Sequence, residues 1–275
     1  MSVFRNLNRT VRVSGGILLA VAMLAIVLPW ISPNDFATVD LDNPLRAPTL
    51  QGMHWFGTDD VGRDQLVRTM HGIRVTLLVA IVASLVSLVI GVAWGAVAGY
   101  VGGRVDAFMM RAVDGLYAIP FLFFVILLMV VFDNSFLLIF IAIGAINWLD
   151  MARIVRGQTL SLREREFVKA ARLIGVSTPG IIARHIAPNL IGVVVVYLTL
   201  TIPQAVLVES FLSFLGLGIQ EPDTSLGTLV DNGTDHLETA SWVILFPAVL
   251  LATILMSFNF LGDGLRDQLD VRERR

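Results

Sequence analysis

Few residues of this 275-residue sequence have the types and spacing that catalysis or cofactor binding requires. A nucleotide-binding P-loop ends in lysine followed by serine or threonine, but the only lysine, Lys169, is followed by Ala170. The absence of cysteine excludes disulfides, thiolate catalysis and cysteine-based metal sites. The histidines show no paired helical spacing, which makes a metal site improbable: His54, His71, His185 and His236. We therefore expect no catalytic residue, metal, cofactor or nucleic acid to be associated with this chain.

Two carboxylates lie within or beside long apolar runs. Glu209 interrupts the run LTLTIPQAVLVESFLSFLG, six residues after Pro203, which can bend a helix. A carboxylate inside the hydrocarbon is costly and normally faces the bundle interior or water. Glu209 could make structural hydrogen bonds or line a translocation path, and the sequence leaves both interpretations open. Asp114 is a second path candidate, although pairing with Arg111 or a neighbouring subunit is the simpler account.

The elements that must position these residues are apolar helices. The chain is 56% hydrophobic and 15% charged, whereas soluble domains carry roughly a quarter charged residues. Runs of roughly 20 apolar residues are long enough to cross a bilayer as helices. Six such runs are present: about Ser14 to Ile31, Val75 to Tyr100, Phe108 to Phe132, Phe136 to Ile154, Asn189 to Leu215, and Ser241 to Leu261. The sequence predicts an all-α, polytopic membrane protein with six transmembrane helices.

The basic residues predict the orientation of these helices, because cytoplasmic loops carry an excess of lysine and arginine. Of the 20 basic residues, only four lie in segments expected outside: Arg46, Arg63, Arg68 and Arg74. The remainder, from Arg5 before the first helix to Arg274 and Arg275 in the tail, lie on the other side. Both termini are expected to be cytoplasmic.

Glycines in the second apolar run predict close helix packing. Gly91, Gly95 and Gly99 repeat every four residues on one helix face. Small residues let helix backbones approach closely in a membrane. This face could pack within the chain or at the seam of a heterodimer.

Two connections between the apolar runs are long. Residues 1–74 are expected to comprise an N-terminal tail, the first helix and an ordered external segment, and residues 75–275 a core domain. Within the core, the loop 156–188 contains Phe167, Ala170, Ala171 and Ile174 at helical spacing. Gly175 stands where a helix end favours a left-handed residue, and Thr178-Pro179 reads as an N-cap and first helical residue.

The loop 156–188 is therefore predicted to form a short helix, a sharp turn and a second short helix. It could be a basic loop that only sets topology. Alternatively, it could insert its apolar face into a groove on a partner while its charges fix orientation.

The same loop carries a family resemblance. EFVKAARLIGVSTPGIIARHIAPN, residues 166–189, resembles the cytoplasmic signature of importer permeases of the ATP-binding-cassette (ABC) superfamily. That signature is Glu-Ala-Ala, three residues, Gly, and nine residues to Ile-x-Leu-Pro. Positions that match or occupy it, together with Glu166 just before it, are the expected ATPase-coupling residues: Glu166, Lys169, Ala170, Ala171, Gly175, His185 and Pro188. Lys169 stands in place of the family's Glu, and His185 and Ala187 in place of its Ile and Leu.

Further segments, including HWFGTDDVGRDQLVRTMHGIRVTL and ESFLSFLGLGIQEPDTSLGTL, look like the C-type permease subunit of dipeptide and oligopeptide importers. The resemblance implies a type I importer permease fold in a bacterial inner membrane. It also implies a peptide substrate, a second permease, two ATPase subunits that hold ATP and Mg²⁺, and an external peptide-binding protein. A permease for nickel or another small solute would share the signature. An ion-coupled secondary transporter should show ionisable relays or inverted repeats, and neither is visible beyond Glu209.

Overall fold

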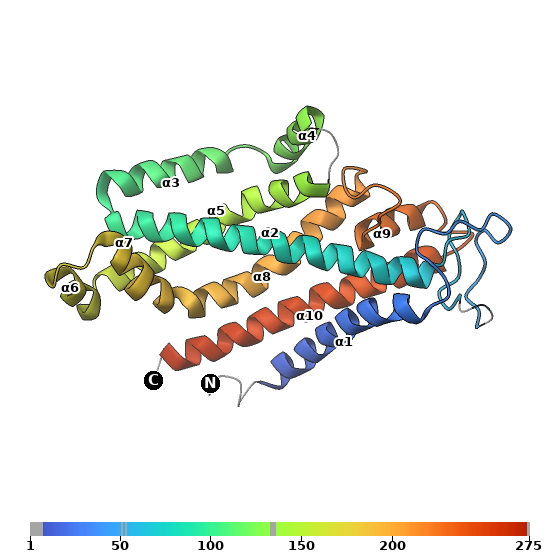
Figure 1. Cartoon of the computed structure of the whole chain (residues 1–275), viewed down its shortest axis with the longest axis horizontal. Helices are drawn as coiled ribbons and strands as arrows, with labels where there is room; N and C mark the ends of the chain where they lie inside the picture. The colour runs from blue at the N-terminus through green and yellow to red at the C-terminus, as the bar shows by residue number, and fades with distance from the viewer. Residues whose placement is uncertain (1–7, 51, 53, 133–135, 274–275) are drawn as a thin grey trace. The chain divides into compact units, whose positions relative to one another are not determined.

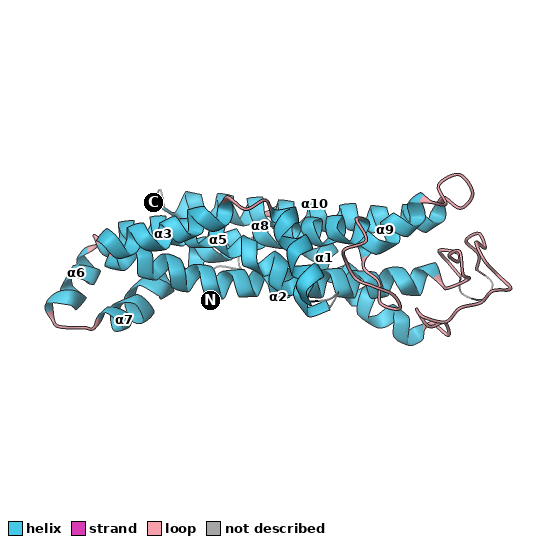
Figure 2. Cartoon of the chain, turned by 90° about the horizontal axis from the view of Figure 1, so that it is seen from above, coloured by secondary structure: helices cyan, strands magenta, loops and turns pink. Residues whose placement is uncertain are grey.

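The computed structural model describes residues 8–50, 52, 54–132 and 136–273. Arg5, Arg274 and Arg275, which contribute to the orientation argument, lie outside the described residues. The described chain is helical and contains no β-strand, only an isolated bridge between Thr58 and Asp64 (Figure 2).

The helices follow one another with irregular connections (Figure 1). They are α1 (Arg9–Ile31), α2 (Gln65–Val101), α3 (Gly103–Tyr117), α4 (Phe121–Phe132), α5 (Phe136–Arg163), α6 (Glu166–Leu173), α7 (Thr178–Ile181), the π-helical turn η3 (Ile182–Ile186), α8 (Ala187–Phe214), α9 (Leu226–Thr234) and α10 (Trp242–Glu273).

Four helical stretches of the described residues are long and apolar enough to cross a membrane: Arg9–Ile31, Gln65–Val101, Thr178–Phe214 and Trp242–Gln268. A fifth candidate is a bent pair, Gly103–Tyr117 with Leu122–Leu128. Residues 133–135, which the structure does not describe, are not part of these helix counts. α5 covers the predicted fourth run. The structure is therefore consistent with about six helices, as predicted.

The third predicted run is a bent pair of helices and not one continuous helix. α3 ends at Tyr117, and the axis turns by 84° before Leu122–Leu128. The cause is local, because Pro120 has no N–H and disfavours helical geometry at Ile119.

Packing divides the chain into two units. The first contains Met1–Ile81 and Ile202–Gln268, and the second contains Val82–Thr201 and Leu269–Arg275. Sequence-based division at residue 74 stays a prediction.

In the first unit, side chains of α2 hydrogen-bond to two backbone carbonyls that prolines leave unpaired in other helices. Pro29 in α1 and Pro247 in α10 each deprive the carbonyl four residues earlier of its helical N–H donor. Arg74 Nε donates to the freed Ala25 oxygen, and Gln65 Nε2 donates to the freed Val243 oxygen at 2.8 Å. Both helices therefore continue through proline without leaving a buried carbonyl unpaired.

In the second unit, the predicted glycine face of α2 packs closely against α5. A Cβ atom added to Gly91 would lie 2.5 Å from Met151 Cβ, and one added to Gly99 would lie 2.8 Å from the Arg156 oxygen. Gly95 lies equally tightly against Ala152 of α5. In this chain the face packs α2 against α5.

Candidate functional site

The loop after α5 folds as the predicted helix–turn–helix. α6 is followed by Gly175 with φ of 83°, which confirms the predicted left-handed glycine. Gly175 N donates to the Arg172 oxygen and Val176 N to the Ala171 oxygen, both at 3.1 Å, which closes the helix end. The second helix begins one residue earlier than predicted, because Ser177 occupies the N-cap position and Thr178 is already helical.

The second short helix does not end before the membrane helix. Ala187 N donates to the Ile182 oxygen five residues earlier, which makes η3 a π-helical turn leading directly into α8. Pro188 could not supply the N–H that a continuing α-helix would need, which accounts for the wider turn. His185 lies in η3, partly buried, and its carbonyl accepts a 2.7 Å hydrogen bond from Asn189 Nδ2.

The two faces of α6 have different surroundings. Val168 and Ala171 are buried in a core formed with α2, α5, α7 and α8. Ala171 thus packs within its own chain, whereas the sequence placed it on the partner-facing side. The outward face consists of Phe167, Ala170, Leu173 and Ile174.

The outward face of α6 is unusually apolar for an exposed surface. Leu173 and Ile174 are 88% and 81% exposed. Leu173 was missed from the sequence because it falls one position outside the spacing used. Exposed apolar clusters are typical of surfaces that bind a partner.

Charged residues flank the outward face of α6. Lys169 Nζ lies 3.3 Å from Glu164 Oε2, and Arg163 Nε also bonds Glu164 at 3.3 Å. The hydrogen bond from Lys169, followed by that from Arg163, lowers the pKa of Glu164. An open groove of about 640 Å³ runs beside them, lined by Leu162, Glu164, Arg165, Glu166, Phe167 and Asn189.

Glu209 is fully buried among hydroxyl groups of the first unit. Its Oε1 accepts from Ser213 Oγ at 2.8 Å, and its Oε2 accepts from Thr76 Oγ1 at 3.2 Å and Ser210 Oγ at 3.5 Å. Ser225, the N-cap of α9, donates to Ser213 Oγ. The carboxyl group thus links α2, α8 and the start of α9. This geometry favours the structural interpretation over the path-lining one.

Asp114 pairs with a residue that the sequence did not suggest. Its Oδ1 lies 2.8 Å from Arg153 Nη2, and the Arg153 guanidinium lies 4.4 Å from the centre of the Tyr117 ring. Tyr117 also hydrogen-bonds Asp150 of α5 at 3.2 Å. Asp150 was missed, although the criterion that selected Glu209, a carboxylate within an apolar run, applies to it equally.

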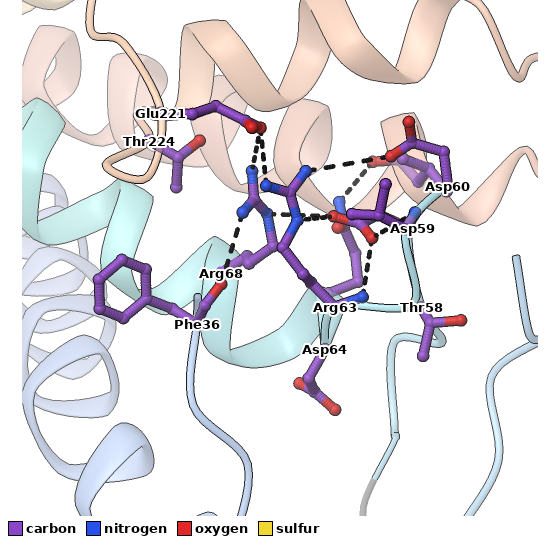
Figure 3. Close-up of polar contacts among 12 residues, drawn as sticks. Phe36, Thr58, Asp59, Asp60, Arg63, Asp64, Arg68, Glu221 and Thr224 are labelled. Atoms are coloured by element: carbon purple, nitrogen blue, oxygen red, sulfur yellow. Dashed lines mark hydrogen bonds and ion pairs between the residues drawn. The ribbon is translucent and has the colours of Figure 1, made fainter. Parts of the chain in front are cut away.

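A third polar cluster holds the segment between α1 and α2 in place (Figure 3). Arg68 is fully buried and lies 3.4 Å from both Asp59 and Glu221, while Arg63 contacts the same two carboxylates at 2.7 and 2.8 Å. Figure 3 shows the two guanidinium groups side by side between these acids. The cluster joins the start of α2 to the loop before α9 and so fixes the described end of this segment against both.

Curated relatives match almost the whole chain. The oligopeptide transport system permease protein OppC of Haemophilus influenzae is 51% identical over 94% of this chain and 83% of its own length. OppC of Escherichia coli K12 is 50% identical over 97% and 88%. The dipeptide transport system permease protein DppC of Bacillus subtilis is 43% identical over 94% and 81%.

A solved structure shares the fold. The MetNI methionine ABC transporter in an inward-facing conformation superposes with a TM-score of 0.59 over 74% of this chain and 96% of that chain, at 20% identity. The architecture is therefore that of an ABC type I importer permease, an inner-membrane multi-pass protein. Residues 91–275 match the family model for the binding-protein-dependent transport system inner membrane component, and the chain belongs to that family.

Proposed function

We propose that this chain is one transmembrane permease subunit of an ATP-driven importer of oligopeptides. The observation that carries the proposal is identity of 50–51% to OppC proteins over 94–97% of the chain. The substrate-conducting path would be formed with a second permease. A peptide-binding protein would deliver the substrate from outside, and both termini would lie in the cytoplasm.

The α6–α7 segment would contact one of the two ATPase subunits of the complex, which bind ATP and Mg²⁺. The exposed face of Phe167, Ala170, Leu173 and Ile174 supplies apolar area for a groove on that ATPase. Lys169 and Glu166 lie beside this face and would fix its orientation.

The opposite face of α6 would transmit the movement. Val168 and Ala171 share one core with Met151 of α5, with Ile186 at the end of η3 and with Leu190 of α8. Close-packed interiors transmit displacement because they compress little. A shift of α6 on nucleotide binding would therefore move α5 and α8, which alternates access to the path.

The function is tested by reconstituting the chain with its second permease, ATPases and binding protein in vesicles. The expected result is uptake of a labelled tripeptide that requires ATP and the binding protein, with no uptake of ⁶³Ni²⁺. Nickel uptake without peptide uptake would contradict the proposal.

A further inference from the structure

A carboxylate in the second unit has no basic partner. Asp150 lies about 20 Å along α5 from the start of that helix, and within the fourth of the predicted membrane-spanning runs. It is partly exposed, and among the described residues no lysine, arginine or histidine lies within ion-pair distance of it. Its two oxygens accept from the Tyr117 hydroxyl at 3.2 and 3.4 Å.

The nearby arginines are already committed to other acids. Arg153 pairs with Asp114 at 2.8 Å, and Arg156 Nη2 pairs with Asp106 at 2.7 Å. Both pairs are neutral in sum. Together these residues therefore carry one uncompensated negative charge, that of Asp150. A carboxylate in a membrane-spanning region must face water or protein and not lipid.

The broken helix adds further negative potential. Tyr117 is the last residue of α3, where the chain turns by 84°. The carbonyl end of a helix carries partial negative charge and favours cations. Ala118 N and Ile119 N donate to the Asp114 and Leu116 oxygens, and Pro120 has no N–H to pair with a further carbonyl of this helix end. Interrupted membrane helices place such ends at ion and substrate sites.

A hydrogen-bond donor lies one helical turn from Asp150. Asn147 Nδ2 is buried and has no hydrogen-bond partner among the residues that the structure describes. Residues three apart on a helix are surface neighbours. Asn147, whose amide nitrogen lacks a described partner, and Asp150 are therefore neighbours on α5.

From this arrangement we propose that Asp150, Tyr117 and Asn147 bind the amino-terminal end of a peptide as it passes through the permease. The α-ammonium group would donate to the Asp150 carboxylate, the Tyr117 oxygen and the carbonyls at the end of α3. Asn147 Nδ2 would donate to the first peptide carbonyl. The proposal rests on the proposed peptide transport, and it adds a residue-level site for the free amino terminus.

The chain's lack of cysteine allows a direct binding test. Leu116 is 46% exposed and precedes Tyr117, so Leu116→Cys places one thiol beside the site. In the complete complex, a free-amine alanine tripeptide at millimolar concentration should slow labelling of this thiol by a water-soluble maleimide. The N-acetylated tripeptide should not, and Asp150→Asn should abolish the protection.

Vesicle uptake provides the second measurement. Asp150→Asn and Tyr117→Phe should each lower uptake of the free-amine tripeptide about tenfold, the typical loss for one charge-assisted hydrogen bond. Asp263→Asn, an exposed carboxylate on α10, is the matched control and should transport normally.

Each contrary result has a defined meaning. If the unsubstituted complex carries no peptide, the proposed function fails. If it carries peptide and Asp150→Asn matches it, or acetylated peptide protects equally, the site assignment fails. Equal protection by an acetylated peptide containing lysine would contradict the amino-terminal assignment. Loss of the second permease from both variant complexes would show that Asp150 pairs with that subunit instead, and would overturn the proposal.

Discussion

Replacement of Gly175 offers a test of the α6–α7 turn with a cost that follows from the structure. The residue has φ of 83°, and among the described residues no atom beyond its chain neighbours lies within 4 Å of a Cβ built on it. A substitution there therefore introduces backbone strain without a steric clash. Left-handed geometry costs an ordinary side chain roughly 1–2 kcal/mol, a β-branched one more, and asparagine less.

The expected order of damage is Val, then Ala, then Asn. A cost of about 2 kcal/mol for valine corresponds to a roughly 30-fold shift away from the native turn. Since the turn positions α6, Gly175→Val should weaken ATPase binding or uncouple ATP hydrolysis from peptide uptake, while membrane insertion and contact with the second permease persist. Gly175→Asn should remain close to normal.

The assay is peptide uptake and ATP turnover in vesicles, measured on each variant. Gly157→Ala in α5 is the control, because it also meets no atom within 4 Å but has ordinary helical geometry. Normal coupled transport by Gly175→Val would refute the assignment of this turn to coupling.

Three further predictions concern other parts of the chain. Glu209→Gln keeps an oxygen acceptor for the surrounding hydroxyls, so this variant should transport within about twofold of normal. Glu209→Ala leaves buried hydroxyls without an acceptor, at a cost of about 1–3 kcal/mol each, and should reduce the yield of assembled complex. Lost uptake by a correctly assembled Gln variant would instead support a role for Glu209 in lining the path. Gly95→Val should lower the stability in detergent by about 1–3 kcal/mol because the added side chain pushes α5 away from α2. Gly16→Val in α1 should leave the stability unchanged, because no described atom lies within 4 Å of a Cβ built there. Equal melting temperatures for the two variants would contradict this packing. Burial, followed by the charge of Asp235, raises the pKa of Asp231, so the folded state disfavours the charged carboxylate and gains stability as pH falls through that pKa. Asp231→Asn should therefore have a higher melting temperature than the unsubstituted protein at pH 7 and lose this advantage in acid. A lower melting temperature of the variant at pH 7 would contradict the prediction.

Local signals predicted local structure well. The turn at Gly175 followed from one glycine before Thr178-Pro179, and the glycine face of α2 followed from a four-residue repeat. These patterns depend on neighbouring residues, so their physical cause lies within the sequence window that shows them.

Features that depend on distant residues were not predicted. Nothing near Pro29 indicates that Arg74 will bond its freed carbonyl, and the hydroxyls around Glu209 come from α2, α8 and the start of α9. Pro120 indicates a possible break, but the apolar residues on both sides of it fit one continuous helix equally well. Helical spacing groups Ala171 with Ala170 in one apolar stripe, but it does not indicate which residues of the stripe pack against the rest of the chain.

The most direct test of the account uses one cysteine on the outward face of α6. Leu173→Cys, carrying a photoactivatable benzophenone in the assembled complex, is predicted to crosslink to an ATPase subunit with a yield that changes when ATP is added. Leu237→Cys, 54% exposed in the loop between α9 and α10, should give no ATPase crosslink. An intact, active complex in which Leu173 gives no ATPase crosslink, or in which Leu237 does, would contradict the account.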